Sequence, residues 1–274
     1  MKHDAAARCV AMENALFSLP ELDWSARCAA VAEAGFGGIY AVPYPLVDDD
    51  FARLRDLAAA PARHGLRLSG VYANIDLALP PEHPMNVRVA RLFSEQNGAP
   101  RVELSFKCSD IAAAPAALDD AIVARIEPLL AVAERRGFDL AIYPHSFYPL
   151  ETPAHAARLA RRLAHPRLGY LFPVSHVYAV SSFEQTLAQL DACAGEIVSF
   201  NLCGCRRAAP GPRAKCLHFG LDEGDFPVDP LLRVLRAADY RGEYILQGHG
   251  WTGDVLGRLR RSARRLQNAL GAVD

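Results

Sequence analysis

The feature that most constrains this chain is a repeated alternation of short apolar runs with longer amphipathic runs. Buried strands are expected in eight short runs: residues 8–12, 38–42, 67–72, 101–105, 139–143, 167–172, 196–202 and 243–247. Helices are expected in the longer runs between and after them: residues 24–34, 51–64, 84–97, 118–136, 154–164, 183–193, 230–239 and 252–270. Strands that alternate with helices are typical of a parallel sheet.

Glycines mark the ends of several of these predicted helices. Gly35, Gly65, Gly137 and Gly242 each lie just before the next strand. Glycine readily takes the left-handed conformation that ends a helix. Repeated βα units at a fairly even spacing predict an α/β fold, a closed (β/α)₈ barrel that forms a single domain over residues 1–274. An open, doubly wound sheet is the alternative. The Pro-Gly-Pro stretch at 210–212 is expected inside a loop rather than at a domain boundary.

The charge balance excludes several classes of partner. The 274 residues include 30 basic and 31 acidic side chains, for a net charge of −1. Such a chain has no field that would draw it to nucleic acid or to an acidic membrane. We expect no membrane segment, and the N-terminus lacks the apolar run of a secretory signal. The 7 cysteines are an odd number at irregular spacing, which favours reduced thiols and a cytoplasmic location.

Side chains that could bind a ligand or take part in catalysis gather where the predicted strands end. In a barrel of this type, the active site lies at the loops that follow the strands. The residues at these ends are Glu13, Asn14, Tyr40, Tyr44, Tyr72, Asn74, Ser105, Lys107, Tyr143, His145, Pro173, His176, Asn201, Cys203, Cys205, Gln247, His249 and Trp251. The set is rich in aromatic, amide and imidazole groups and poor in carboxylates.

Four segments of the chain resemble a known family in order and spacing. They are AGFGGIY at 34–40, GLRLSG at 65–70, HFGLDEGDF at 218–226 and AADYRGEYIL at 237–246. Together they resemble the xylose isomerase-like TIM barrel superfamily, which includes sugar phosphate isomerases and epimerases and is related to endonuclease IV. The resemblance covers nearly the whole chain and implies the same barrel.

The resemblance also implies a divalent metal held by four side chains at successive strand ends. In the family these are a glutamate, an aspartate, a histidine and a glutamate, and the two glutamates move a proton on neighbouring carbons of the sugar. The same positions here are Tyr143, Pro173, Asn201 and Gln247, and the glutamate often found after the second strand is Tyr40. Hard dications prefer carboxylate oxygen, so we predict that the usual metal site is lost and that no cofactor is used.

Other residues match family positions that face the pocket. His145 and His176 are the candidates for catalysis, because imidazole titrates near neutral pH. The expected substrate-binding residues are Lys107, Tyr143, Asn201, Arg206, His218 and Gln247. Each of these residues also has an interpretation without a role in binding or catalysis. A histidine at a strand end often only holds the structure through hydrogen bonds, and a lysine or loop arginine is often only solvated.

One group of cysteines does not come from the resemblance. Cys203, Cys205, Cys216 and His218 form a C-x-C and a C-x-H pair. Thiolate and imidazole ligands suit tetrahedral Zn²⁺. This spacing is not a common zinc motif, so unpaired reduced thiols remain the simpler interpretation.

Three functions are compatible with these observations. The first is an isomerase- or epimerase-like barrel that binds a polyhydroxylated small molecule with the metal site lost. The second is a non-catalytic barrel that binds a sugar-like ligand or a protein partner. The third is a nuclease like endonuclease IV, which needs a multi-zinc cluster and a positive surface. Only His176 and His218 match that cluster, so the third ranks last.

Overall fold

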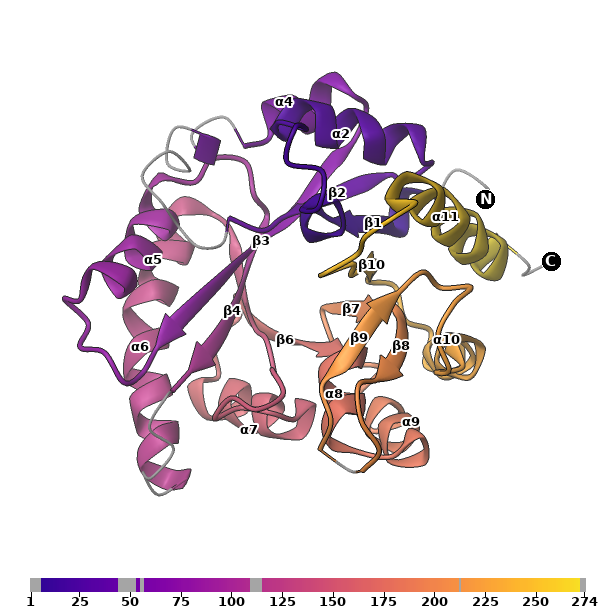
Figure 1. The fold of residues 1–274 in the computed structure, drawn as a ribbon. Coiled ribbons are helices and arrows are strands. Elements are labelled where there is room, and N and C mark those ends of the chain that lie inside the picture. Colours follow the sequence, from indigo (N-terminus) through magenta and orange to yellow (C-terminus); the bar gives the residue numbers. More distant parts are fainter. Residues whose placement is uncertain (1–5, 44–52, 55–56, 109–114, 212, 272–274) are drawn as a thin grey trace.

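The chain folds into a closed barrel of parallel strands with helices around it. The computed structural model describes residues 6–43, 53–54, 57–108, 115–211 and 213–271. The barrel strands are β1 (Cys9–Met12), β2 (Gly38–Ala41), β3 (Arg67–Asp76), β4 (Arg101–Lys107), β5 (Asp139–Ile142), β6 (Leu168–Pro173), β7 (Ser199–Leu202) and β10 (Glu243–Leu246). They close in the order β1-β10-β7-β6-β5-β4-β3-β2 (Figure 1). The predicted (β/α)₈ barrel is confirmed.

Helices connect the strands and cover the outside of the barrel (Figure 1). They are η1 (Glu13–Leu16), α2 (Trp24–Glu33), α4 (Ala59–Arg63), α5 (Pro84–Glu95), α6 (Pro115–Arg136), α7 (Pro153–Leu163), α8 (Val174–Val180), α9 (Phe183–Asp191), α10 (Val228–Ala237) and α11 (Val255–Gly271). Tyr44 and, within the predicted helix 51–64, residues 51, 52, 55 and 56 lie outside the described part of the chain.

Local signals in the sequence set the ends of several helices. The Asp23 side chain accepts a hydrogen bond from the backbone N–H of Ala26 at 2.8 Å. Ser182 and Gln185 form a reciprocal capping box at the start of α9. These bonds satisfy N–H groups that the first turn leaves without a partner. Gly35, with a φ of +97°, follows α2 as predicted.

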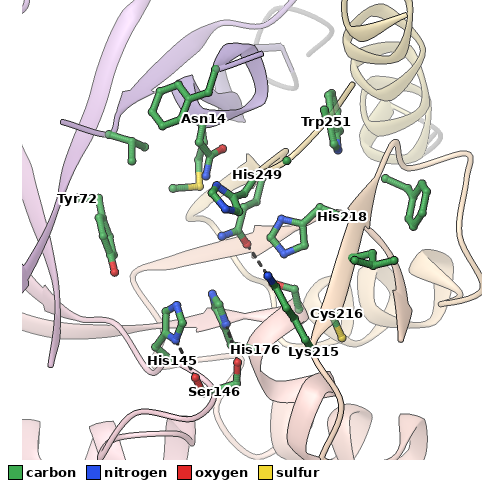
Figure 2. A pocket seen from close by; sticks show the side chains of 18 of the residues that line it. Asn14, Tyr72, His145, Ser146, His176, Lys215, Cys216, His218, His249 and Trp251 are labelled. Carbon is green, nitrogen blue, oxygen red and sulfur yellow. Dashed lines mark hydrogen bonds between the residues drawn. The ribbon is translucent and has the colours of Figure 1, made fainter. Parts of the chain in front are cut away.

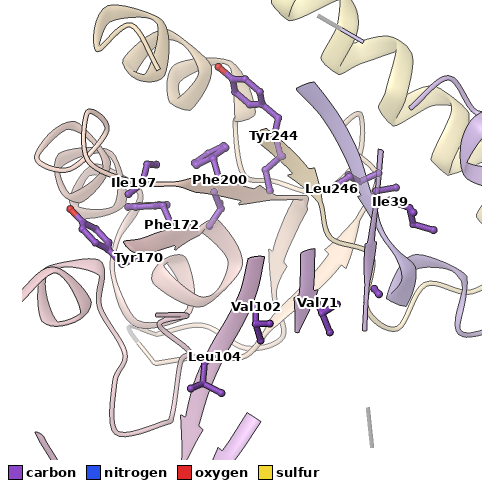
Figure 3. Close-up of a cluster of buried hydrophobic side chains, with 14 of the residues drawn as sticks. Ile39, Val71, Val102, Leu104, Tyr170, Phe172, Ile197, Phe200, Tyr244 and Leu246 are labelled. Carbon is purple, nitrogen blue, oxygen red and sulfur yellow. The ribbon is translucent and has the colours of Figure 1, made fainter. Parts of the chain in front are cut away.

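Successive side chains along each strand point alternately toward the surrounding helices and toward the inside of the barrel. In β4, Val102 and Leu104 belong to the hydrophobic core under the helices, whereas Glu103 is buried but lies outside that core. Phe172, Phe200 and Leu246 lie in the same outer layer (Figure 3). The inner set is therefore free to carry polar groups, which hydrogen-bond inside the barrel.

Charged residues occupy the amino-terminal end of the barrel interior. Arg101 contacts Glu103 at 3.1 Å and Glu243 at 2.9 Å. Ser199 donates a hydrogen bond to Glu103 at 2.8 Å, and Arg67 also pairs with Glu243. Burial alone would raise the pKa of Glu243, but the charge of Arg101 and the contacts with Ser69 and Arg67 together outweigh burial and hold that pKa below its usual range. Arg67, Arg101, Glu103, Ser199 and Glu243 are called the amino-end ion network below.

The loop after β7 contains a hairpin that the sequence did not predict. Strands β8 (Gly204–Arg207) and β9 (Cys216–Phe219) pair antiparallel, with Cys205 opposite His218. A side chain at Gly204 would meet the Gly220 carbonyl oxygen at 2.0 Å, so only glycine permits this approach. Their sequences, Gly-Cys-Arg-Arg and Cys-Leu-His-Phe, contain no continuous apolar run, which is the pattern that predicts a buried strand.

Candidate functional site

A cavity of about 590 Å³ opens at the carboxyl-terminal ends of the strands. This volume is typical of a small-molecule site. The lining side chains come from loops around the barrel and from the β8–β9 hairpin (Figure 2). They include Met12, Asn14, Phe17, Tyr72, Asn74, Tyr143, His145, Ser146, Phe147, Tyr148, Ser175, His176, Lys215, Cys216, Leu217, His218, Phe219, Gln247, His249, Trp251, Thr252 and Arg258.

The bottom of the cavity is a neutral hydrogen-bonded chain. Ser175 donates to Gln247 Oε1 at 3.1 Å, and Gln247 Nε2 donates to the Tyr143 hydroxyl at 3.3 Å. Burial raises the pKa of Tyr143 well above its usual value, although hydrogen bonds from Asn201 and Gln247 oppose that change. The phenol therefore stays protonated at neutral pH. Ser175, Tyr143, Gln247 and Asn201 are called the neutral chain below.

Strand register explains why these residues meet. Pro173 lies opposite Asn201 across β6 and β7, and Asn201 lies opposite Ile245 on β10. Gln247, two residues beyond Ile245, therefore emerges above Asn201. Asn201 is fully buried and does not line the cavity, so it supports the neutral chain from below.

Two histidines lie together on the β5–β6 side of the cavity. The ring centroids of His145 and His176 are 3.8 Å apart, and Tyr148 stacks on His145 at 3.9 Å. The Ser146 hydroxyl hydrogen-bonds His176 Nδ1 at 3.0 Å, and the Ser146 carbonyl hydrogen-bonds His145 Nδ1 at 2.8 Å. The other nitrogen of each ring is available to a ligand in the cavity.

Four histidines in the cavity are neutral at physiological pH. Burial lowers the pKa of His145 to about 4 and that of His218 to about 3. The pKa of His176 lies well below its usual value, first through burial and then through His145. Burial and the charge of Lys215 also lower the pKa of His249. Neutral imidazoles can donate and accept hydrogen bonds with a ligand.

The β8–β9 hairpin forms the opposite wall. Lys215, Cys216, Leu217, His218 and Phe219 line the cavity from this hairpin. Figure 2 shows Lys215 and His218 with their side chains directed toward the middle of the cavity. This wall carries the cationic side chain that is most accessible to a ligand, since Lys215 is exposed.

The structure brings together only some of the predicted site residues. Tyr143, His145, His176, His218 and Gln247 all line the cavity. By contrast, Lys107 pairs with Asp76 at 3.4 Å and lies outside the lining.

Arg206 also lies outside the cavity lining. Its guanidinium is 5.0 Å from the centre of the Phe219 ring. Sequence position placed Arg206 near the strand ends, but the hairpin carries it onto the outer surface. The neighbouring arginines are already occupied: Arg207 donates to the Tyr178 and Gly211 carbonyls, and Arg213 pairs with Glu151.

The cysteines form a buried thiol group behind the hairpin wall. Cys203 Sγ and Cys205 Sγ are 3.3 Å apart, and both side chains are fully buried. The pKa of Cys205 is raised by its hydrogen bond with Cys203 and by burial, although its contact with Cys216 opposes that rise. Among the described residues, no three histidine, cysteine, aspartate or glutamate side chains are grouped so that they could hold a metal ion.

Several cavity residues were not assigned a role from the sequence. Lys215, Ser146 and Ser175 line the cavity. Ser146 and Ser175 adjoin the strand-end residues His145 and His176 but belong to no motif, and Lys215 lies in the long loop after the seventh predicted strand. His249 and Trp251 follow the last strand, and their position was the only signal. Recognition of the hairpin would have placed Lys215 and His218 on one wall.

The donor atoms at the four family positions do not suit a hard dication. Tyr143 keeps its proton, Pro173 has no side-chain donor, and the amides Asn201 and Gln247 are uncharged. Mn²⁺, Mg²⁺ and Co²⁺ are bound mainly by carboxylate oxygen. The residues present therefore do not fit the metal that the resemblance implies.

Comparisons with known proteins agree with this architecture. The family model of xylose isomerase-like TIM barrels matches residues 28–268. No curated protein matches the sequence. Among the described residues, no helix is both long and apolar enough to cross a membrane.

Solved structures of epimerases and of an endonuclease are similar to this fold. A 3-keto-D-glucoside 4-epimerase from E. coli is 15% identical, with a TM-score of 0.72 over 95% of this chain and 99% of that one. D-Psicose 3-epimerase with D-tagatose from Clostridium cellulolyticum H10 is 14% identical, with a TM-score of 0.66 over 97% of each chain. An AP endonuclease, family 2, from Brucella melitensis is 16% identical, with a TM-score of 0.68 over 94% of this chain and 98% of that one. At these identities the similarity establishes the fold alone.

Proposed function

Because the chain belongs to the xylose isomerase-like TIM barrel family, we propose that its cavity binds a polyhydroxylated small molecule without a divalent metal. The observation that carries this proposal is the neutral chain. Ser175, Gln247 and Tyr143 already satisfy one another at the strand ends where the family holds its metal. A carboxylate-free donor set gives a dication no compensation for its lost hydration.

The composition of the cavity supports a hydroxylated ligand. Neutral imidazoles and amides offer both donors and acceptors, as ligand hydroxyls require. Tyr72 and Tyr143 pack edge to face with ring centroids 5.4 Å apart and give this side an aromatic surface. Aromatic walls with a few placed polar groups are typical of small-molecule sites.

The proton-transfer step of the family has no counterpart at the same positions. Glutamine has no titratable proton near neutral pH, and the Tyr143 phenol is held in its protonated form. His145 and His176 are the proposed residues for any proton transfer that remains. Their lowered pKa values make them weak bases, which favours a binding protein or a slow enzyme over an efficient isomerase.

The nuclease alternative has less support. It requires a multi-zinc site, whereas the described residues include no suitable group of three ligands. The similarity to the endonuclease structure concerns the fold, which does not determine function.

The test is a titration of the protein with Mn²⁺ followed by electron paramagnetic resonance. We expect a dissociation constant weaker than about 1 mM, because no carboxylate lies at the four positions. The matched control is the combined variant Tyr143→Glu, Pro173→Asp, Asn201→His and Gln247→Glu, checked for folding by circular dichroism. It should bind Mn²⁺ more tightly than the natural chain.

The same samples also test for catalysis. In D₂O with a panel of ketoses and Mn²⁺, the natural chain should exchange no hydrogen next to the carbonyl above the background rate. Stoichiometric Mn²⁺ binding by the natural chain, or hydrogen exchange that appears only when Mn²⁺ is added, would contradict the proposal.

A further inference from the structure

The lining of the cavity has an uneven distribution of charge. The residues that line the cavity include two cationic side chains, Lys215 and Arg258, and no aspartate or glutamate among the described part of the chain. A ligand that enters therefore meets positive charge and no described carboxylate in the lining to balance it. Such a site favours negative charge on the ligand.

The two cations are not equivalent. Arg258 Nε lies 3.0 Å from both carboxylate oxygens of Glu223, and its guanidinium also donates to the Thr252 carbonyl at 3.1 Å. Its charge is thus already compensated. Lys215 is exposed and has no ion pair among the described residues. Its ammonium is the cation that a ligand can reach.

Hydrogen-bond donors surround the same wall. His218 and His249 lie beside each other, with ring centroids 6.3 Å apart. His218 Nδ1 and Trp251 Nε1 are buried without a hydrogen-bond partner in the structure. The Trp251 indole N–H can only donate, and His218 Nδ1 donates when the ring proton is on that nitrogen. A buried donor without a partner is costly, so an acceptor brought by a ligand would be favourable here.

We propose that the ligand carries an oxyanion, a carboxylate or a phosphate, that binds against Lys215, His218 and His249. The hydroxyl groups of the same ligand then contact the neutral chain and the pair His145 and His176. This inference rests on the proposed function, because it adds the charge of the ligand to a cavity proposed to bind a hydroxylated molecule.

The chemistry of the wall explains why the anion is placed there. The pKa of His218 is lowered first by burial and then by His249, His145 and Lys215, so an added positive charge is unfavourable on this wall. A negative charge on the ligand would instead be attracted to the positive charge of Lys215. The charges that lower this pKa come from His249, His145 and Lys215, which are all imidazoles or cations, and Cys205 lies opposite His218 in the hairpin.

The test compares ligands that differ in one group. D-Gluconate and D-glucitol differ only in a carboxylate in place of a terminal CH₂OH, and D-glucitol 6-phosphate adds a phosphate. Affinities are measured by isothermal titration calorimetry at pH 7 and low salt. At least one anion should bind about tenfold or more tightly than glucitol, which corresponds to about 1.4 kcal/mol. The anion that binds more tightly shows whether the site prefers a carboxylate or a phosphate.

Two variants locate the effect. Lys215→Met should remove the preference for the anion and leave the affinity for glucitol nearly unchanged. The matched control is Lys107→Met, because Lys107 ends a barrel strand but lies outside the cavity lining. That variant should keep the full preference.

Each result has a definite meaning. If glucitol binds as tightly as both anions, or if Lys215→Met keeps the preference, the inference is wrong while the proposed function stands. If neither anion binds, the oxyanion assignment is wrong, and Mn²⁺ titration still tests the proposed function separately.

Discussion

The two ends of the barrel interior handle polar groups in opposite ways. At the amino-terminal end, Arg67, Arg101, Glu103 and Glu243 form direct ion pairs inside the barrel. At the carboxyl-terminal end, the neutral chain and the histidines meet at equivalent strand positions without a carboxylate in the described lining. Charge at the amino-terminal end is compensated within the protein, whereas at the carboxyl-terminal end the histidines and Lys215 that line the cavity can contact a ligand.

This difference separates stability from binding. Removing any member of a buried ion network strongly destabilises the fold, because the remaining charge is left without a partner in a low-dielectric interior. Neutral hydrogen bonds such as that between Gln247 and Tyr143 are individually weaker. The comparison predicts that substitutions at the amino-terminal end mainly change folding, and that those at the cavity mainly change ligand binding.

The largest expected effect is at the amino-end ion network. Arg101→Met leaves Glu103 and Glu243 without their shared partner and should lower the free energy of unfolding by about 3–5 kcal/mol. The cavity counterpart Tyr143→Phe removes one hydrogen bond to Gln247 and should cost about 1 kcal/mol. Urea denaturation of both variants measures the difference. Equal losses would mean that the two ends do not differ in this way.

The next effect is the dependence of stability on pH. In the unfolded chain, histidine has a pKa of about 6.5, whereas in the folded protein the pKa is about 4 for His145 and about 3 for His218. As the pH falls from 7 to 5, the unfolded state takes up protons that the folded state does not. Stability should therefore fall by about 2 kcal/mol for each of these histidines.

The same pH range separates the two ends of the barrel. The pKa of Glu243 is lowered in the folded protein, so its contribution is lost only below the pH at which a free glutamate titrates, about 4.5 or lower. His218→Asn should make the loss of unfolding free energy between pH 7 and 5 smaller by about 2 kcal/mol. Urea denaturation at each pH measures this difference. An unchanged profile would show that His218 is not held in its neutral form.

The smallest expected effect is at the rim of the cavity. Arg213 pairs with Glu151 at 2.7 Å and thereby links the hairpin to the loop before α7, but the arginine is largely exposed. Exposed pairs contribute little, so Arg213→Ala should lower the unfolding free energy by less than about 1 kcal/mol. Thermal denaturation measures this change. A much larger loss would make the rim part of the structural framework.

The sequence by itself was sufficient for the barrel and for part of the site. Repeated strand and helix patterns predicted the closed (β/α)₈ fold, because side-chain periodicity follows from local backbone geometry. Residues directly at strand ends, such as Tyr143, His145 and Gln247, were correctly placed in one cavity because parallel strands share one carboxyl-terminal edge.

Only the tertiary structure decided which charged groups face the cavity. The short hairpin directs Lys215 into the cavity and leaves Arg206 outside the lining, although both lie in the same loop of the sequence. Asp76 pairs with Lys107 outside the lining, and Asn201 lies beneath the cavity rather than in it. Side-chain direction in a long loop depends on pairing with distant residues, and periodicity within the sequence carries no information about that pairing.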